Sequence, residues 1–126
     1  MNRSRTISIT VKKKTGDAFD AILKIPPKMM PDAKINDAGW WSFTGPYGKS
    51  KLKFNEDRSK GTLDHQYVDE VSSWNVPMQV VSNGDYSEVT VTLNKPDELT
   101  DVQFDQRVVE VGEMFDSMKS ILESDP

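Results

Sequence analysis

The sequence predicts an α+β fold in which an antiparallel sheet packs against one long C-terminal helix, and two patterns carry this prediction. The apolar residues of segment 101–123 recur at alternating steps of four and three, which places them on one stripe of an α-helix: Phe104, Val108, Val111, Phe115, Met118 and Leu122. Between residues 6 and 93, apolar and polar residues alternate in short runs, and Asn83-Gly84 marks a tight hairpin. At about 1.5 Å per residue the helix is roughly 34 Å long, so we expect it to lie across the sheet.

Composition limits the class of protein. The chain has 126 residues, of which 36% are apolar and 29% charged, so we expect a single domain over residues 1–126 with one core. The absence of cysteine excludes a disulfide framework, a thiolate zinc site and a cysteine nucleophile. The N-terminal residues lead directly into alternating sequence, and no apolar run approaches 18 residues. We therefore expect a soluble, cytoplasmic protein without integral membrane association.

The first predicted elements are a strand, a helix and a helical turn. Segment 6–11 alternates apolar and polar residues, which indicates a half-buried strand. A helix then starts at a cap provided by Thr15 or Asp17 and ends before Pro26-Pro27. Pro27 is well placed to open a second short helical turn over residues 28–30.

Five further strands joined by short turns follow before the long helix. Period-2 alternation predicts them at residues 39–43, 49–54, 62–67, 74–80 and 89–93, which makes six strands in all. Pro77 has no N–H to donate, so the fifth strand lies at a sheet edge or bulges at that residue. No repeat, linker or low-complexity segment divides the chain.

Strand parity selects the candidate binding residues. Leu63, His65 and Tyr67 share one face of their strand, and Leu63 assigns that face to the apolar side. Twelve residues are predicted to line a ligand-binding space between this face and the last helix: Trp41, Phe43, Leu52, Phe54, Leu63, His65, Tyr67, Val76, Met78, Val111, Phe115 and Met118. With one histidine and no clustered carboxylates, we expect no metal site and no cofactor.

Two features of this candidate site have alternative interpretations. His65 can protonate or hydrogen-bond a ligand, or it can be a structural histidine beside Tyr67. The doublet Trp40-Trp41 must send its rings to opposite faces, so we expect one ring to be exposed. Together with Met29-Met30 these rings could line a mouth for an apolar ligand, or they could belong to the core and a sheet edge.

Charge is distributed unevenly along the chain. Residues 1–60 carry 13 Lys/Arg and 6 Asp/Glu, a balance of +7, whereas residues 61–126 carry 3 and 14, a balance of −11. Either these charges solvate opposite faces of one sheet, or the molecule is strongly dipolar and associates head to tail, for example as a homodimer, or steers a charged partner.

A basic ladder stands out in the first half of the chain. Lys49, Lys51 and Lys53, with Arg58 and Lys60, could bind phosphate or lipid headgroups, or they could form a solvated face that resists edge pairing. The sequence pI near 5.0 and the lack of aromatic residues interleaved with these lysines argue against nucleic acid as a partner.

The order of elements resembles the helix-grip fold of the START/SRPBCC superfamily, which includes birch-pollen-allergen-like proteins, polyketide cyclases and chaperone-ATPase-activator homologues. Four stretches carry the resemblance: residues 7–11, residues 18–22, the hairpin 82–85 feeding residues 89–91, and the closing helix. It implies a curved sheet wrapped around the last helix, with two short helices after the first strand. Six predicted strands, where many members have seven, are a departure from the pattern.

The resemblance implies a binding fold for apolar ligands such as lipids, sterols or aromatic polyketides, and it implies no particular reaction. We therefore expect a non-enzymatic protein that holds a small hydrophobic or aromatic ligand between sheet and helix. One alternative is a cyclase or dehydratase that uses His65 and Tyr67 in the same space. Another is a cochaperone-like interaction module whose interior is filled.

Overall fold

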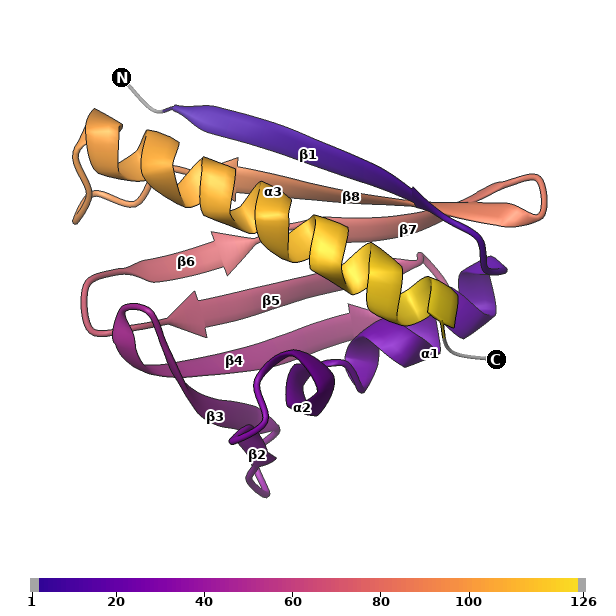
Figure 1. Ribbon diagram of the computed structural model, residues 1–126, viewed down its shortest axis with the longest axis horizontal. Coiled ribbons are helices and arrows are strands. Elements are labelled where there is room, and N and C mark those ends of the chain that lie inside the picture. Colours follow the sequence, from indigo (N-terminus) through magenta and orange to yellow (C-terminus); the bar gives the residue numbers. More distant parts are fainter. Residues whose placement is uncertain (1–2, 125–126) are drawn as a thin grey trace.

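The structure, a computed structural model, describes residues 3–124 and shows an antiparallel sheet crossed by one long helix (Figure 1). The elements, in chain order, are β1 (Ser4–Val11), α1 (Thr15–Leu23), α2 (Pro26–Met29), β2 (Lys34–Ile35), β3 (Trp40–Gly45), β4 (Gly48–Asp57), β5 (Thr62–Val68), β6 (Ser73–Val76), β7 (Met78–Asn83), β8 (Tyr86–Asn94) and α3 (Asp101–Ser124). The strand order is β1-β8-β7-β5-β4-β3-β2, with β6 also paired to β5. The predicted α+β fold class is confirmed.

The structure has eight strands within residues 3–124, so the predicted number of six is wrong for two reasons. β2 has only two residues, and it exists because it pairs with β3. The predicted strand 74–80 is divided at Pro77 into β6 and β7. Both parts pair with β5 in one register, His65 with Val76 and Thr62 with Gln79, so they form one bent strand.

Pro77 marks the point where this bent strand gains a second partner. From Met78 onward β7 pairs with β8, beginning with Met78 opposite Val91, while Gln79 still pairs with Thr62 of β5. Pro77 cannot donate a ladder hydrogen bond, but its carbonyl oxygen accepts one from the backbone N–H of Thr92 at 2.9 Å. The strand expected to lie at an edge or bulge at Pro77 is therefore divided there, and β8 joins it beyond that residue.

Two details of the short helices also differ from the prediction. α1 begins at Thr15 with Lys14 in the N-cap position and no side-chain cap, so neither Thr15 nor Asp17 caps it. α2 begins at Pro26 rather than after Pro27, because a proline is compatible with the first helical position, where the N–H has no partner. None of the helices in the described part of the chain is long and apolar enough to span a membrane.

The face of the sheet that α3 covers, called the inner face here, holds the core. Each of these inner-face side chains of β1, β7 and β8 is at most 4% exposed: Val11, Met78, Val80, Val89, Val91 and Leu93. They meet the buried residues Phe104, Phe115, Met118 and Leu122 of α3. The rings of Trp74 and Phe104 stack with their centroids 6.1 Å apart. The predicted apolar stripe therefore packs on the sheet, although Val108 and Val111 stay half-buried.

Candidate functional site

The inner face of β3, β4 and β5 carries apolar and aromatic side chains that α3 does not fully cover. The register places Trp41, Leu52 and Tyr67 in one row across the three strands, and it places Phe54 opposite His65 in the next row. We call these five residues and Phe43 the inner patch. All six are half-buried, in contrast to the buried inner face of β7 and β8.

The other six predicted site residues divide between the core and the helix. Val111 is half-buried on α3, and five residues are buried in the core: Leu63, Val76, Met78, Phe115 and Met118. These five residues belong to the core that packs against the inner patch, and little of their surface is exposed. Contact of any of the twelve residues with a ligand stays a prediction.

Aromatic contacts organise the inner patch. The rings of Phe43 and Tyr67 stack with a centroid separation of 6.4 Å, and the ring of Phe54 meets the His65 ring edge-on at 5.5 Å. Trp41 lies on the inner face and Trp40 on the outer face, as a strand doublet requires. The expectation that one ring is exposed is wrong, since both are half-buried. The Lys51 ammonium group lies 4.8 Å from the Trp40 ring centroid and accounts for part of the cover over that ring.

Among residues 3–124, one ring nitrogen of His65, Nδ1, has a hydrogen-bond partner and the other, Nε2, has none. Its Nδ1 lies 3.0 Å from the carbonyl oxygen of Leu63. A carbonyl oxygen only accepts hydrogen bonds, so Nδ1 carries the proton and Nε2 is the acceptor of the neutral ring. Burial lowers the pKa of His65 below its ordinary value, which favours the neutral ring at pH 7. His65 can therefore accept one hydrogen bond from a bound molecule.

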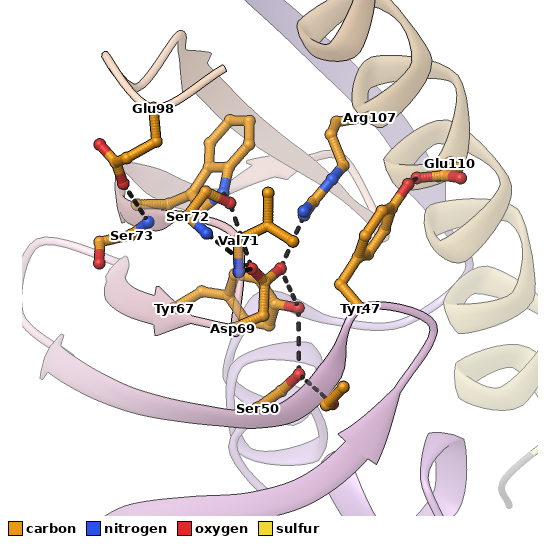
Figure 2. A network of polar contacts seen from close by, with 12 residues as sticks. Tyr47, Ser50, Tyr67, Asp69, Val71, Ser72, Ser73, Glu98, Arg107 and Glu110 are labelled. Atoms are coloured by element: carbon orange, nitrogen blue, oxygen red, sulfur yellow. Dashed lines mark hydrogen bonds and ion pairs between the residues drawn. The ribbon is translucent and has the colours of Figure 1, made fainter.

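A cluster of hydrogen-bonded polar groups closes one end of the inner patch (Figure 2). The Asp69 side chain is completely buried, and its Oδ2 lies 2.8 Å from Nη1 of Arg107, whose side chain is 8% exposed. The Tyr67 hydroxyl donates to the same oxygen at 3.0 Å. The other carboxylate oxygen accepts the backbone N–H groups of Val71 and Ser72, each at 2.8 Å.

The donors around Asp69 keep its carboxylate charged. Burial alone raises the pKa of Asp69, but the hydrogen bonds from Arg107, the two backbone amides and Tyr67 outweigh it, and the net pKa is lowered. Burial raises the pKa of Tyr67 to about 12, so its hydroxyl stays protonated and available as a donor at neutral pH. The cluster is thus a buried ion pair with a fixed pattern of donors and acceptors.

Tyr47 covers Arg107 from the turn between β3 and β4. The guanidinium carbon of Arg107 lies 3.4 Å from the centre of the Tyr47 ring, and the Tyr47 hydroxyl donates to Oε1 of Glu110 at 2.5 Å. This hydrogen bond, followed by burial, raises the pKa of Tyr47. Within residues 3–124, Nη2 of Arg107 is the one buried side-chain polar atom without a partner.

The sequence prediction missed Asp69, Arg107 and Tyr47, and two of the three had a readable signal. Asp69 lies two residues after Tyr67, so strand alternation places it on the same inner face as Leu63, His65 and Tyr67. Arg107 lies three residues after Phe104 and four before Val111, so it stands on the apolar stripe of α3. Tyr47 lies in a turn, and neither period assigns a turn residue to a face.

Two hollows at the surface lie beside the sheet, and the larger one borders the inner patch at Phe43. One has a volume of about 650 Å³ and lies between β2, β3 and β4; of the twelve predicted residues, Phe43 lines it. The other has a volume of about 340 Å³ between α1 and the turn after β4, and none of the twelve lines it. In the described part of the chain, no group of three or more His, Asp or Glu residues is arranged to hold a metal ion.

Comparison with known proteins shows that this chain is similar to several of them in fold. No family model matches the sequence, and no curated protein matches it. Among solved structures, the Aha1 dimer of Colwellia psychrerythraea is 17% identical, with a TM-score of 0.75 over 96% of both chains. Norcoclaurine synthase of Thalictrum flavum is 13% identical, with a TM-score of 0.70 over 97% of this chain and 87% of its own.

A third similar structure is that of Ara h 8.0201, which is 14% identical, with a TM-score of 0.70 over 99% of this chain and 100% of its own. These identities are low, so the agreement is one of backbone architecture over nearly the whole chain. The long helix α3, the antiparallel sheet and the two short helices after β1 occupy the places that the resemblance predicted. The chain therefore has the helix-grip fold of these structures.

Proposed function

We propose that this protein binds a small apolar or aromatic molecule on the inner patch, between β3–β5 and α3. The observation that carries the proposal is the contrast in burial across one continuous sheet face. The inner-face residues of β7 and β8 are buried in the core with α1 and α3, whereas the six residues of the inner patch stay half-buried. Partly exposed aromatic side chains gathered in register are typical of a contact surface.

The chemistry of the inner patch suits a flat, largely apolar ligand. Phe43, Phe54 and Tyr67 offer ring faces and edges, and the patch contains a single imidazole acceptor at Nε2 of His65. Few polar groups among apolar walls are the usual composition of a small-molecule site. The proposal favours binding over catalysis because His65 makes no hydrogen bond to a second ionisable side chain within residues 3–124.

One similar structure supports the ligand class. Norcoclaurine synthase of Thalictrum flavum, 14% identical to this chain with a TM-score of 0.69, has been solved in complex with dopamine and hydroxybenzaldehyde, two small aromatic molecules. The same backbone architecture therefore accommodates ligands of the size and type proposed here.

Titration with the neutral fluorescent probe N-phenyl-1-naphthylamine tests the proposal. We expect saturable binding to the wild-type protein, and about tenfold weaker binding for Leu52→Ser or Phe43→Ser, because each removes apolar contact worth roughly 1–2 kcal/mol. The matched control is Val68→Ser, which removes a half-buried apolar residue from the opposite face of β5. Far-UV circular dichroism verifies that each variant is folded.

Two results would reject ligand binding at this place. One is the absence of saturable binding to the wild-type protein, which would favour the interaction-module alternative. The other is an equal loss of affinity in the inner-face variants and in Val68→Ser, because equal loss would show that the probe does not distinguish the two faces.

A further inference from the structure

The 650 Å³ cleft extends from Phe43 and Ser50 on the inner face to the outer face of the sheet, where three lysines line it. Lys34, Ser42, Lys51 and Val68 form one row across β2, β3, β4 and β5, and all four line the cleft. This row has the parity opposite to Trp41, Leu52 and Tyr67, so its side chains belong to the outer face.

Asp32, Lys49 and Ser50 complete the polar lining of the cleft, together with the two outer-face hydroxyl groups of Ser42 and Thr44. Lys49 lies opposite Thr44 in the β3–β4 register, so it has the same parity as Lys51. Lys49 and Lys51 are about 7 Å apart along β4, and Lys34 lies two strands away from Lys51, at about 10 Å. Three ammonium groups on flexible stems can thus converge above the two hydroxyl groups.

The structure removes one ordinary explanation for these lysines. Lysines on an edge strand prevent unwanted strand pairing, but β4 is paired to β3 on one side and to β5 on the other. Protection of an edge therefore does not explain Lys49, Lys51 or Lys53.

The carboxylates near the cleft are already engaged by the backbone. Asp32 accepts the backbone N–H of Thr44 at 2.9 Å, and Glu70 accepts that of Lys49 at 2.7 Å. Within residues 3–124, Lys34, Lys49 and Lys51 form no ion pair with either of them or with any other carboxylate. The lining thus holds three lysines without an ion pair against one carboxylate, Asp32, and a concave surface with such an excess of positive charge attracts an anion.

We propose that the outer, lysine-lined part of this cleft binds an anion with two or more linked phosphate groups. Phosphate oxygens accept hydrogen bonds from ammonium and hydroxyl groups together, and each charge-assisted bond is stronger than a neutral one. A volume of about 650 Å³ lies in the range of small-molecule sites. The phosphate groups can belong to a soluble metabolite or to a phosphorylated lipid headgroup.

Calorimetric titration with sodium tripolyphosphate at low salt tests the proposal. We expect one-to-one binding that is weakened about tenfold by Lys51→Met and by Lys49→Met, because each removes a charge-assisted contact. Lys24→Met is the matched control, since Lys24 is an exposed lysine after α1 and its loss changes the net charge equally. Trp40 gives an independent signal because it lies beside Lys51, and its fluorescence should change on binding in the wild-type protein.

Three results would overturn the proposal: no binding of tripolyphosphate, equal weakening by Lys24→Met, or tighter binding of heptaglutamate than of tripolyphosphate. Two further titrations identify the source of the phosphate groups. Tighter binding to phosphatidylcholine vesicles containing phosphatidylinositol 4,5-bisphosphate than to inositol 1,4,5-trisphosphate would support the proposal with a lipid headgroup as the source. Equal or tighter binding of the soluble trisphosphate would support it with a soluble metabolite.

Discussion

Arg107 shows how a single charged residue is accommodated in the interior. Its guanidinium group is paired with a completely buried carboxylate and covered by the Tyr47 ring. Taking both charges out of water is costly, and the hydrogen bonds that the Asp69 carboxylate accepts from Arg107, Tyr67 and two backbone amides offset part of that cost. Replacing only one partner leaves the other charge buried and unpaired.

Asp69→Asn should therefore lower the free energy of unfolding by about 3–5 kcal/mol. The substitution preserves shape and removes the charge that faces Arg107. Urea denaturation followed by circular dichroism measures the effect. Asp105→Asn is the control, because the Asp105 side chain is 55% exposed in its ion pair with Arg3, and that variant should lose less than about 1 kcal/mol. A loss below about 1 kcal/mol for Asp69→Asn would show that the buried pair is not coupled as described.

His65 predicts a pH dependence of stability. Burial lowers its pKa in the folded protein below the unfolded value of about 6.5, so the unfolded chain binds more protons just below that pH. The contribution is fully present above pH 6.5 and is lost as the pH falls toward the folded pKa. His65 is the only histidine, so no other imidazole titrates in this window.

The urea midpoint of the wild-type protein should accordingly fall between pH 7.5 and pH 5.5 more steeply than that of His65→Gln. Glutamine retains polarity and does not titrate, so it isolates the imidazole. Parallel curves for the two proteins would mean that the pKa of His65 is not lowered by folding.

At the scale of elements, the grip of α3 on the sheet depends on a few large side chains. Phe115 is 7% exposed and belongs to the core, so Phe115→Ala should cost about 3–5 kcal/mol in chemical denaturation. Val109→Ala on the exposed side of the same helix should change stability by about 0.5 kcal/mol or less, since Val109 is 56% exposed. Similar losses in the two variants would contradict the assignment of faces.

The sequence predicted the elements whose hydrophobic periodicity extends over enough residues to be recognised. The stripe of α3 spans more than five turns, and the parity of Leu63, His65 and Tyr67 fixed the inner face correctly. β2 could not be predicted because two residues, Lys34 and Ile35, carry no period, and β3 alone supplies their hydrogen bonds.

The candidate site was predictable in its apolar part and less so in its polar part. Asp69 and Arg107 lie on faces that parity and helical spacing had already assigned to the interior. Their ion pair, however, joins the end of β5 to α3 across 38 residues of sequence, and no local sequence pattern indicates such a contact. The position of Tyr47 depends on the same long-range packing, because its ring lies on Arg107.

At the scale of the whole molecule, the uneven distribution of charge along the sequence corresponds to a separation of basic and acidic residues in space. The outer face of β2–β4 carries Lys34, Lys49, Lys51 and Lys53, whereas the exposed acidic residues of α3 lie over the opposite face of the sheet: Asp101, Asp105, Glu113 and Asp116. The molecule therefore has a basic side and an acidic side.

Two copies can meet through these sides, basic against acidic. We expect sedimentation velocity to show association at 10–20 mM salt that disappears above about 100 mM, where the screening length is about 10 Å. The double variant Lys49→Met/Lys51→Met should associate more weakly at low salt. A monomer at every salt concentration would contradict this prediction, and a dimer insensitive to salt would require an apolar contact instead.

The bent strand around Pro77 has a mechanical consequence. The half-sheet β1-β8-β7 and the half-sheet β5-β4-β3-β2 share one registered pair, Thr62 with Gln79, and beyond it β6 follows β5 while β7 follows β8. Because few main-chain hydrogen bonds join the two halves there, we expect this junction to be the part of the sheet that deforms most easily. If the proposed ligand binds at the inner patch, we expect the deformability of this junction to set the largest ligand that the protein admits.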